Sequence, residues 1–266
     1  MADEEVLPQG RGGFIVTRSA KGVHRPAGPW TPTVHAFLEH LTAQGFDGAP
    51  MPLGFDDSGR EVVSWIEGEV LSDPEWEPGL PTPWPAYAQT EEVLVEAGDL
   101  IRRLHEAAAT FRPPTPIWKQ YAWPMLLEGE IVCHGDLGPH NSVYRDGHLV
   151  GLIDWDAIRP NGPDIEFANA AWHYVPLADD EYFARSGFGA TPDVPRRLRM
   201  FAEAYGIDDP ERILWALQEH VQRTAENLRY WHPSPLATVT LLGWLSDQLR
   251  WLDAQRDVLH QALRIR

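Results

Sequence analysis

Hydrophobic positions in the first 70 residues follow a short period that predicts strands, with one helix among them. Strands are expected at residues 14–17, 23–24 and 61–66, because each is a short apolar run bounded by turn residues. A helix is expected to start at Thr31 and to end at Gly45. Its apolar residues recur at helical spacing, at Val34, Phe37, Leu38 and Leu41.

After a proline-rich stretch at residues 71–85, the pattern changes to long helical segments. Helices are expected at residues 86–109, 194–205, 210–230 and 237–263. The fold class is therefore predicted to be α+β. A small β-rich lobe with one helix would span residues 1–68, and a larger, mainly helical lobe would span residues 69–266.

Composition and charge narrow the possible partners. The chain is 43% hydrophobic, which is typical of a globular protein, and its net charge is −17. This acidic balance argues against nucleic acid and anionic membranes as partners and mildly favours a cationic small molecule. A single cysteine, Cys133, excludes an internal disulfide. Since no run approaches the roughly 18 apolar residues of a membrane helix, we expect a cytoplasmic protein.

The segment 131–156 carries the candidate chemistry. An apolar strand at residues 131–133 leads into a polar loop that contains His134, Asp136 and Asn141. Two further strands flank Asp146-Gly147, a dipeptide favoured in two-residue hairpin loops.

This hairpin returns the chain towards the polar loop. Around an Asp146-Gly147 turn, Arg145 would pair with His148 and Ser142 with Gly151. By extension, Pro139 would lie opposite Asp154, which places Asp154 near Asn141. Diagonal neighbours across strands lie roughly 7–8 Å apart, a separation that one divalent cation can bridge. A carboxylate at Asp136 could then orient a hydroxyl group and accept its proton.

The order His134-Gly-Asp136-x4-Asn141, followed by Ile153-Asp154-Trp155, resembles the motif of the aminoglycoside phosphotransferase family. That family is related to choline kinases and to protein kinases, whose catalytic loop has the same Asp-to-Asn spacing. The resemblance implies a bilobal protein-kinase-like fold. It also implies that Asp136 is the catalytic base, that Asn141 and Asp154 bind Mg²⁺, and that ATP or GTP is the co-substrate.

Other parts of the family pattern are matched less closely. Leu104-His105 resembles the end of the family's long helix, and Glu166 stands where an aspartate usually braces the catalytic loop. By the same resemblance, Trp155 would pack against Asp154.

The resemblance also assigns the nucleotide-binding residues. Where the family has a strand lysine that binds the phosphates, this chain offers Arg25, with His24 as the second candidate. Glu39, on the following helix, is its expected ion-pair partner. A glycine-rich loop over the phosphates would include Gly10 and Gly12. The hinge that meets the purine would include residues 64–66, hence Trp65 and Ile66.

The predicted function is a Mg²⁺-dependent transfer of the γ-phosphoryl group of ATP or GTP to a small-molecule hydroxyl. One alternative is a kinase-like protein that binds a nucleotide or ligand without efficient transfer, since Arg25 replaces the usual lysine. Another is a metal-dependent phosphohydrolase that uses Asp136, Asp154 and Asp156. The acceptor, the choice between ATP and GTP, and the oligomeric state stay open.

Overall fold

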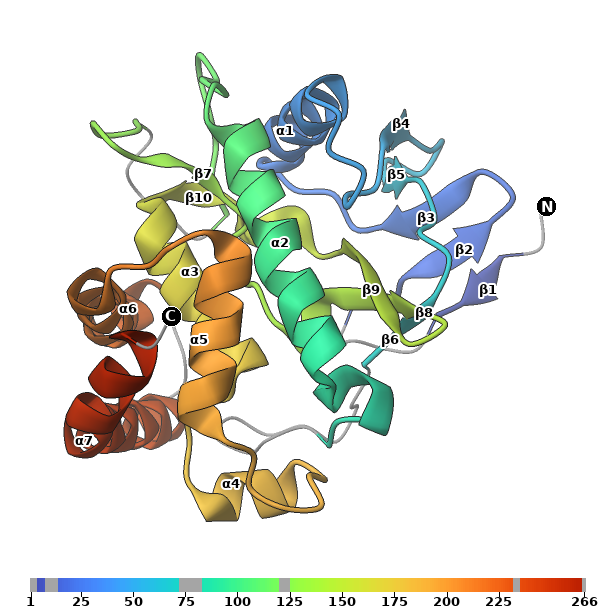
Figure 1. Ribbon diagram of the computed structural model, residues 1–266. Helices are drawn as coiled ribbons and strands as arrows, with labels where there is room; N and C mark the ends of the chain where they lie inside the picture. The colour runs from blue at the N-terminus through green and yellow to red at the C-terminus, as the bar shows by residue number, and fades with distance from the viewer. Residues whose placement is uncertain (1–3, 8–13, 72–82, 120–124, 232–234, 265–266) are drawn as a thin grey trace. The chain divides into compact units, whose positions relative to one another are not determined.

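The computed structural model describes residues 4–7, 14–71, 83–119, 125–231 and 235–264 (Figure 1). The chain forms two compact units. The first comprises residues 1–75, 103–136 and 140–161, and the second comprises residues 76–102, 137–139 and 162–266.

The first unit is built around an antiparallel sheet in the order β1-β2-β3-β5-β4 (Figure 1). Its strands are β1 Glu5–Val6, β2 Thr17–Ser19, β3 Gly22–Arg25, β4 Pro52–Phe55 and β5 Glu61–Val63. Helix α1, Thr31–Ala43, buries the four apolar residues that the sequence places on its inner side, and Gly45 follows it with φ +80°. The strand expected at residues 61–66 ends at Val63. The segment expected at 14–17 contributes only its last residue to β2.

Two smaller sheets in the same unit carry the candidate chemistry. They are β6-β8-β9, with β6 Glu69–Val70, β8 Ser142–Arg145 and β9 His148–Leu152, and β7-β10, with β7 Ile131–Cys133 and β10 Arg159–Asn161. Two 3₁₀ turns flank the hairpin, η2 Pro139–Asn141 and η3 Trp155–Ala157.

The β8-β9 hairpin follows the expected turn but shifts register along its length. Asp146 and Gly147 both have positive φ, 54° and 83°, as their turn requires, and Arg145 pairs with His148. Beyond Tyr144 a bulge changes the register, so that Ser142 pairs with Leu152 and not with Gly151. An irregularity of this kind depends on packing around the strands, which a count from the turn does not include.

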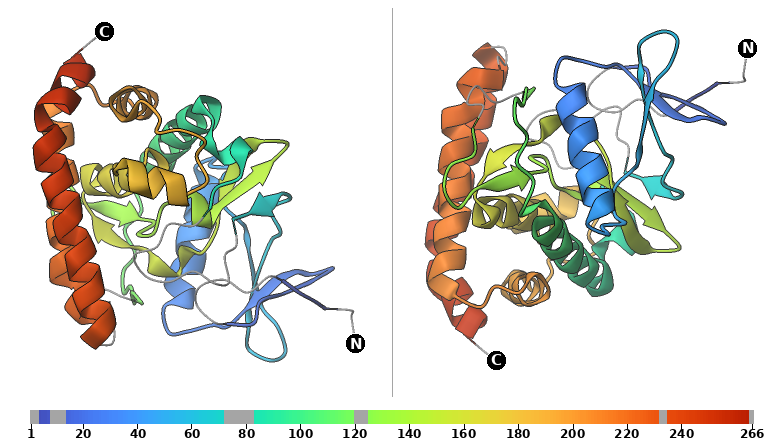
Figure 2. Two further views of the ribbon diagram at one scale, coloured as in Figure 1. Left: turned by 90° about the horizontal axis from the view of Figure 1, so that it is seen from below. Right: turned by 90° about the horizontal axis from the view of Figure 1, so that it is seen from above.

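The second unit is helical. Its helices are α3 Pro163–Tyr174, α4 Asp180–Arg185, α5 Val194–Tyr205, α6 Pro210–Trp231 and α7 Pro235–Arg264. The 3₁₀ turn η1, Ala86–Gln89, precedes α2, Glu91–Ala108, whose last turns belong to the first unit. Helices α6 and α7 lie side by side (Figure 2). The helix expected at residues 194–205 has those bounds. The helices expected at 210–230 and 237–263 agree with α6 and α7 to within two residues at each end.

A buried arginine ties three segments of the second unit together. The guanidinium of Arg197, on α5, donates hydrogen bonds to the carbonyls of Gln89, Tyr174 and Val175. Burial lowers its pKa to about 10, although the charge of Glu91 acts in the opposite direction. Arg197 is therefore protonated at neutral pH and satisfies main-chain carbonyl groups of three segments.

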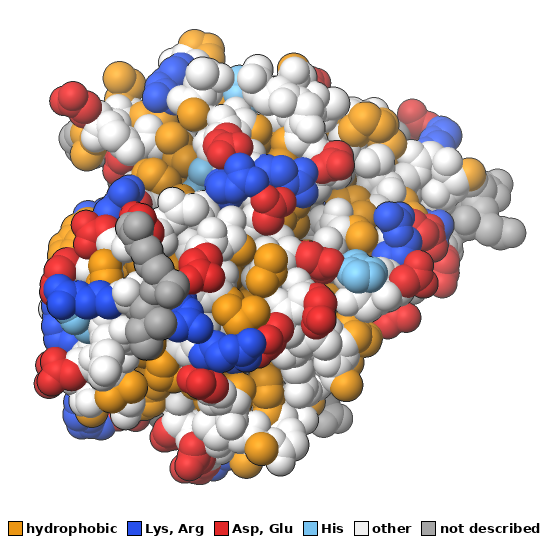
Figure 3. All heavy atoms as spheres, in the orientation of Figure 1, with side chains coloured by type: hydrophobic (Ala, Val, Ile, Leu, Met, Phe, Trp, Pro, Cys, Tyr) orange, Lys and Arg blue, Asp and Glu red, His pale blue; other side chains and the backbone are white. Residues whose placement is uncertain are grey.

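Charged groups of both signs are interspersed over the face shown in Figure 3. Among the helices within the described residues, none is both long and apolar enough to cross a membrane.

Gly68 lies where a side chain cannot fit. Its φ is +150°, and a Cβ atom there would lie 2.4 Å from the carbonyl oxygen of Tyr144. Gly59 also has a positive φ, +78°, but a Cβ atom there would meet open space. We predict that Gly68→Ala lowers the free energy of unfolding by about 3 kcal/mol, and Gly59→Ala by about 1 kcal/mol. Urea denaturation measures both values, and equal losses would contradict the steric argument.

Arg60 links the N-terminal edge of the sheet to the β4-β5 turn. It contacts Glu4 at 2.8 Å and Asp56 at 2.8 Å. Hydrogen bonds from Arg60 and then Thr17 lower the pKa of Glu4 to about 2, against its ordinary 4.5. A carboxyl with a depressed pKa stabilises the fold above its unfolded pKa and loses that contribution as the pH falls.

We therefore predict that Arg60→Met lowers the melting temperature at pH 6. The difference in melting temperature between the variant and the wild type should shrink as the pH falls from about 4.5 to about 2. Melting curves across this range check the prediction, and a constant difference would refute it.

Candidate functional site

Asp136 and Asn141 are joined by hydrogen bonds within the loop that follows β7. The Nδ2 group of Asn141 donates to the main-chain oxygen of Asp136 at 2.8 Å and to its carboxylate Oδ2 at 2.9 Å. Asn141 is buried, whereas the Asp136 side chain is 49% exposed. Because both hydrogen bonds use the amide donor, the Oδ1 acceptor of Asn141 is left for a cation.

The end of the β8-β9 hairpin returns Asp154 to this loop. The amide of Ile153 donates to the carbonyl of Asn141 at 2.9 Å. Asp154, the next residue, is exposed and has a left-handed backbone, with φ 62° and ψ 61°. Outside glycine such a conformation is uncommon and costs about 1–3 kcal/mol, so the surroundings must hold it in place.

Two aromatic side chains fix the chain on either side of Asp154. His134 Nε2 hydrogen-bonds the carbonyl of Ile153 at 3.0 Å, and the indole of Trp155 donates to the carbonyl of Leu152 at 3.0 Å. The His134 and Trp155 rings are 4.5 Å apart, and Trp155 also contacts Phe37 on α1. His134 and Trp155 therefore hold the main chain of Leu152 and Ile153, the two residues before Asp154.

Arg25, at the end of β3, is surrounded by three carboxylates. Its Nε lies 3.0 Å from Glu61, and one terminal nitrogen lies 2.8 Å from Asp156 and 3.2 Å from Asp154. Burial alone would lower the pKa of Arg25, but the charges of Asp156, Asp154 and Glu61 outweigh burial and raise it. The guanidinium thus stays charged beside the exposed carboxylate of Asp154.

Glu39 does not pair with Arg25. It lies exposed on α1, while His35, one turn earlier on the buried side of that helix, contacts Glu61 at 3.2 Å. Glu61 is directly opposite Arg25 on the neighbouring strand β5, where cross-strand pairing brings the two side chains together. Among the described residues, Glu61, Asp154 and Asp156 are the ion-pair partners of Arg25.

His24 points to the other face of the sheet, because neighbouring strand residues alternate. Its Nδ1 lies 2.9 Å from Asp56 and its Nε2 2.8 Å from the hydroxyl of Ser19. Of the two candidates on β3, Arg25 is therefore the one that lies beside Asp154.

Glu61, Lys119 and Asp156 also belong to the site, although the sequence did not assign them to nucleotide binding. Glu61 is a buried charge in an apolar strand, a pattern that could have signalled a buried partner. Lys119 contacts Asp156 at 2.8 Å and comes from an irregular segment without any motif. Asp156 is held by two cations, Arg25 and Lys119, so its carboxylate is engaged and not left for a metal ion.

The remaining predicted nucleotide contacts fall into two groups. Gly10 and Gly12 lie outside the described residues. Trp65 and Ile66 lie in the irregular link between β5 and β6. The Trp65 indole donates to Glu67 at 2.8 Å, and Ile66 packs where Gly151 leaves room, since a Cβ atom at Gly151 would be 3.0 Å from Ile66 Cδ1.

The oxygen donors present fit a hard divalent cation. Asn141 offers an amide oxygen, and Asp154 a carboxylate of which the described contacts occupy one oxygen, Oδ1. Mg²⁺ prefers such ligands and completes its shell with phosphate oxygens and water.

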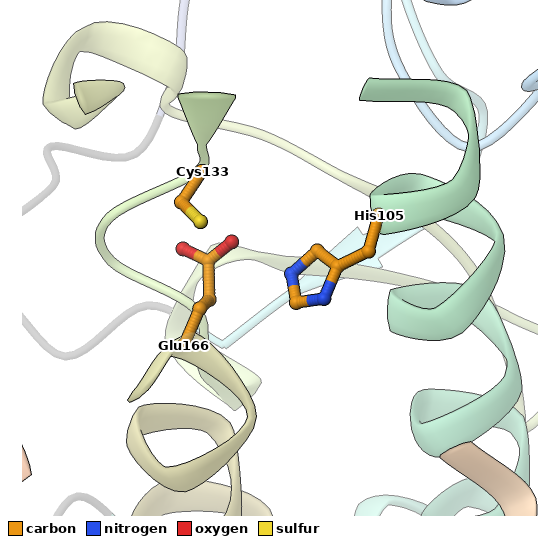
Figure 4. A group of neighbouring side chains, drawn as sticks. All are labelled: His105, Cys133 and Glu166. Carbon is orange, nitrogen blue, oxygen red and sulfur yellow. The ribbon is translucent and has the colours of Figure 1, made fainter. Parts of the chain in front are cut away.

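Three buried side chains outside this group are drawn in Figure 4: His105 on α2, Cys133 on β7 and Glu166 on α3. The Cys133 thiol donates to the carbonyl of Asn161 at 3.7 Å across the β7-β10 pair. Cys133 is thus a buried residue of the β7-β10 sheet.

Comparison with known proteins identifies the family of this chain. The model of the phosphotransferase enzyme family, APH, matches residues 116–214. The trifolitoxin immunity protein of Rhizobium leguminosarum bv. trifolii is 34% identical over 272 residues, which cover 98% of this chain and 99% of the relative. The chain therefore belongs to the phosphotransferase enzyme family. By class it is a small-molecule phosphotransferase.

Solved structures show the same fold. An aminoglycoside phosphotransferase from Alicyclobacillus acidocaldarius superposes with a TM-score of 0.57 at 14% identity, over 98% of this chain and 94% of that one. The ADP-bound aminoglycoside phosphotransferase APH(2'')-Ib has a TM-score of 0.53 at 11% identity, over 94% of each chain. The fold is thus the α+β fold of these kinase-like enzymes, as the sequence predicts.

Because three carboxylates surround Arg25, removal of its charge should greatly lower the stability of the fold. We predict that Arg25→Met lowers the free energy of unfolding by about 3–5 kcal/mol, because Glu61 would be left as a buried charge without its guanidinium. Arg103→Met is the matched control, since the Arg103–Asp47 pair is exposed and its loss should cost under about 1 kcal/mol. Urea denaturation gives both values, and similar losses would show that the Arg25 cluster adds no stability.

Proposed function

We propose that this phosphotransferase moves the γ-phosphoryl group of ATP or GTP to a hydroxyl group of a small molecule, with Mg²⁺ bound. The proposal rests on hydrogen bonds that link the positions of Asp136, Asn141 and Asp154. Asp136 is hydrogen-bonded to Asn141, and Asn141 is hydrogen-bonded to the residue before Asp154. Phosphoryl transfer needs positioned oxygen ligands and a group that orients the acceptor, which is the chemistry these residues offer.

Asp136 is the proposed base. Its carboxylate is half exposed, so an acceptor hydroxyl can reach it, and Asn141 holds one of its oxygens in a fixed direction. His140 Nε2 lies 3.4 Å from the other oxygen. Asp136 would accept the hydroxyl proton as the oxygen bonds to phosphorus, while the nucleoside diphosphate leaves.

Asn141 and Asp154 are the proposed metal-holding residues. When bound there, Mg²⁺ would supply positive charge to the phosphate oxygens and so favour the departure of the diphosphate. The left-handed backbone at Asp154 directs its carboxylate, and the contacts of His134 and Trp155 maintain that direction.

Arg25 is the proposed phosphate cation. Its planar guanidinium can donate to two phosphate oxygens at once, and Glu61 and Asp156 would keep it in position. We assign nucleotide binding to residues 1–68, with Gly10 and Gly12 over the phosphates and the backbone at Trp65 and Ile66 against the base. Acceptor binding is assigned to residues 69–266.

The acceptor is proposed to be a toxin or antibiotic, and the role one of protection inside the cell. The 34% identical relative is named as a trifolitoxin immunity protein. The net charge of −17 favours a cationic acceptor through long-range attraction.

A second candidate function is binding without transfer. The observation that favours it is the ion pair between Arg25 and Asp154, at 3.2 Å, in which the proposed metal ligand is already neutralised by a cation of the chain. In that case the protein would sequester its ligand and leave the nucleotide intact.

Asp136→Asn separates these functions. We predict that the variant lowers the Mg²⁺-dependent turnover of nucleotide by about 10²–10⁴-fold, because the amide cannot accept the hydroxyl proton, while its nucleotide affinity stays unchanged. Asp146→Asn is the matched control, since Asp146 lies in the exposed hairpin turn, where asparagine tolerates the positive φ.

The measurement combines calorimetric nucleotide binding with an acceptor panel of aminoglycosides, macrolides, amino alcohols, nucleoside antibiotics and trifolitoxin. Mass spectrometry then detects a phosphorylated acceptor. Phosphorylation by Asp136→Asn at the wild-type rate would refute the role of Asp136. Nucleotide binding without any product over the whole panel would favour the second function.

A further inference from the structure

Lys119 lies within the charged cluster and has no role in the function proposed above. Its Nζ is 2.8 Å from Oδ2 of Asp156, and Oδ1 of the same carboxylate is 2.8 Å from Arg25. One carboxylate therefore holds two cations, two residues along the chain from the proposed metal ligand Asp154.

The surroundings of Lys119 favour an anionic ligand. Its side chain is 25% exposed, and its ammonium lies 4.9 Å from the ring of Trp30 and 5.8 Å from that of Phe14. The indole Nε1 of Trp30 is buried and has no acceptor among the described residues, as is also true of Trp118, the neighbour of Lys119 in the chain. Donors without acceptors cost free energy, and the Trp30 indole is such a donor within the ring that the Lys119 ammonium approaches.

The position of Lys119 relates it to the nucleotide phosphates. Phe14 follows the glycine-rich stretch that is proposed to cover the phosphates, and Asp156 belongs to the segment that carries Asp154. Lys119 thus lies beside Asp156 and near the ring of Phe14, the residue that follows the predicted phosphate-covering stretch. A lysine ammonium has three donors, and its bond to Asp156 uses one of them.

The net charge around Arg25 and Lys119 depends on whether a divalent cation is bound. Glu61, Asp154 and Asp156 carry three negative charges against the two positive charges of Arg25 and Lys119. If a divalent cation takes over Asp154, the net charge of this cluster rises by two, which favours the entry of a polyphosphate.

We propose that Lys119 is a further phosphate-contacting residue, which stabilises the transferred γ-phosphoryl group together with Arg25, while Asp156 positions both cations. This proposal rests on the proposed function and extends it to a residue outside the motif of residues 134–155. A second cation at the transferred group would also offset the replacement of the strand lysine by Arg25.

The chain offers an unusually direct test, because Lys21 and Lys119 are its only two lysines. An acyl-phosphate derivative of ATP or GTP transfers its acyl group to a lysine amine close to the phosphates. Incubation of the full chain with this probe, followed by peptide mapping, should show Lys119 acylated, and excess Mg²⁺-nucleotide should suppress the reaction. Lys21, which is exposed in the β2-β3 turn, is the internal control and should react weakly and without suppression.

Kinetics of variants give an independent readout. Lys119→Met should raise the KM for nucleotide about tenfold and lower kcat about 10²-fold, since one donor to the transferred group is lost. Lys119→Arg should restore most of the activity because it keeps the charge, and Lys21→Met should behave as the wild type. A merely structural role would lower the melting temperature of Lys119→Met without changing the KM for nucleotide.

Two outcomes separate this proposal from the proposed function. A wild-type protein that binds and consumes nucleotide, with Lys119 unlabelled and Lys119→Met kinetically unchanged, would overturn the role of Lys119 alone. A wild-type protein that binds no Mg²⁺-nucleotide would overturn the proposed function and this extension with it.

Discussion

The largely buried guanidinium of Arg25 is the constraint on which the candidate site depends. It joins β3 to Glu61 on β5 and to Asp154 and Asp156 after β9, so one side chain connects the five-stranded sheet with the segment that carries the proposed metal ligand. A buried charge of this kind is tolerated only when opposite charges and hydrogen bonds surround it. The same arrangement keeps Arg25 charged and fixes its direction, which are the two properties that phosphate binding requires.

The segment around Asp154 shows how the fold maintains an uncommon backbone conformation. Asp154 has a positive φ, and the residues on either side of it are held by His134, Trp155 and the pairing of Ile153 with Asn141. Gly135, with φ +86°, allows the loop to approach this segment, since a Cβ atom there would lie 2.2 Å from the carbonyl oxygen of Ala157. The strain at Asp154 is therefore balanced by packing that involves α1 through Phe37. Such local strain is typical of positions where a side chain must point in one direction.

At the position predicted for the family's strand lysine, the guanidinium of Arg25 determines how the carboxylates are held together. Its fork can contact more than one carboxylate at the same time, and this accounts for the simultaneous pairs with Asp154 and Asp156. Metal binding at Asp154 would have to compete with that pair. The residues that remain around Arg25, Glu61 and Asp156, would keep it in place after such an exchange.

The sequence by itself determined the spacing of Asp136 and Asn141, the helices α5, α6 and α7 and the turn at Asp146-Gly147. These features depend on local periodicity and on turn chemistry within a few residues, so they can be read from neighbouring positions. The partners of Arg25 could not be read in this way, because Asp154 is 129 residues away and strand pairing, not helix spacing, selects Glu61 over Glu39. The bulge that shifts Ser142 to Leu152 and the approach of Lys119 to Asp156 were likewise decided by tertiary packing. Long-range contacts of charged side chains follow from where the whole chain places them, and no short pattern encodes that position.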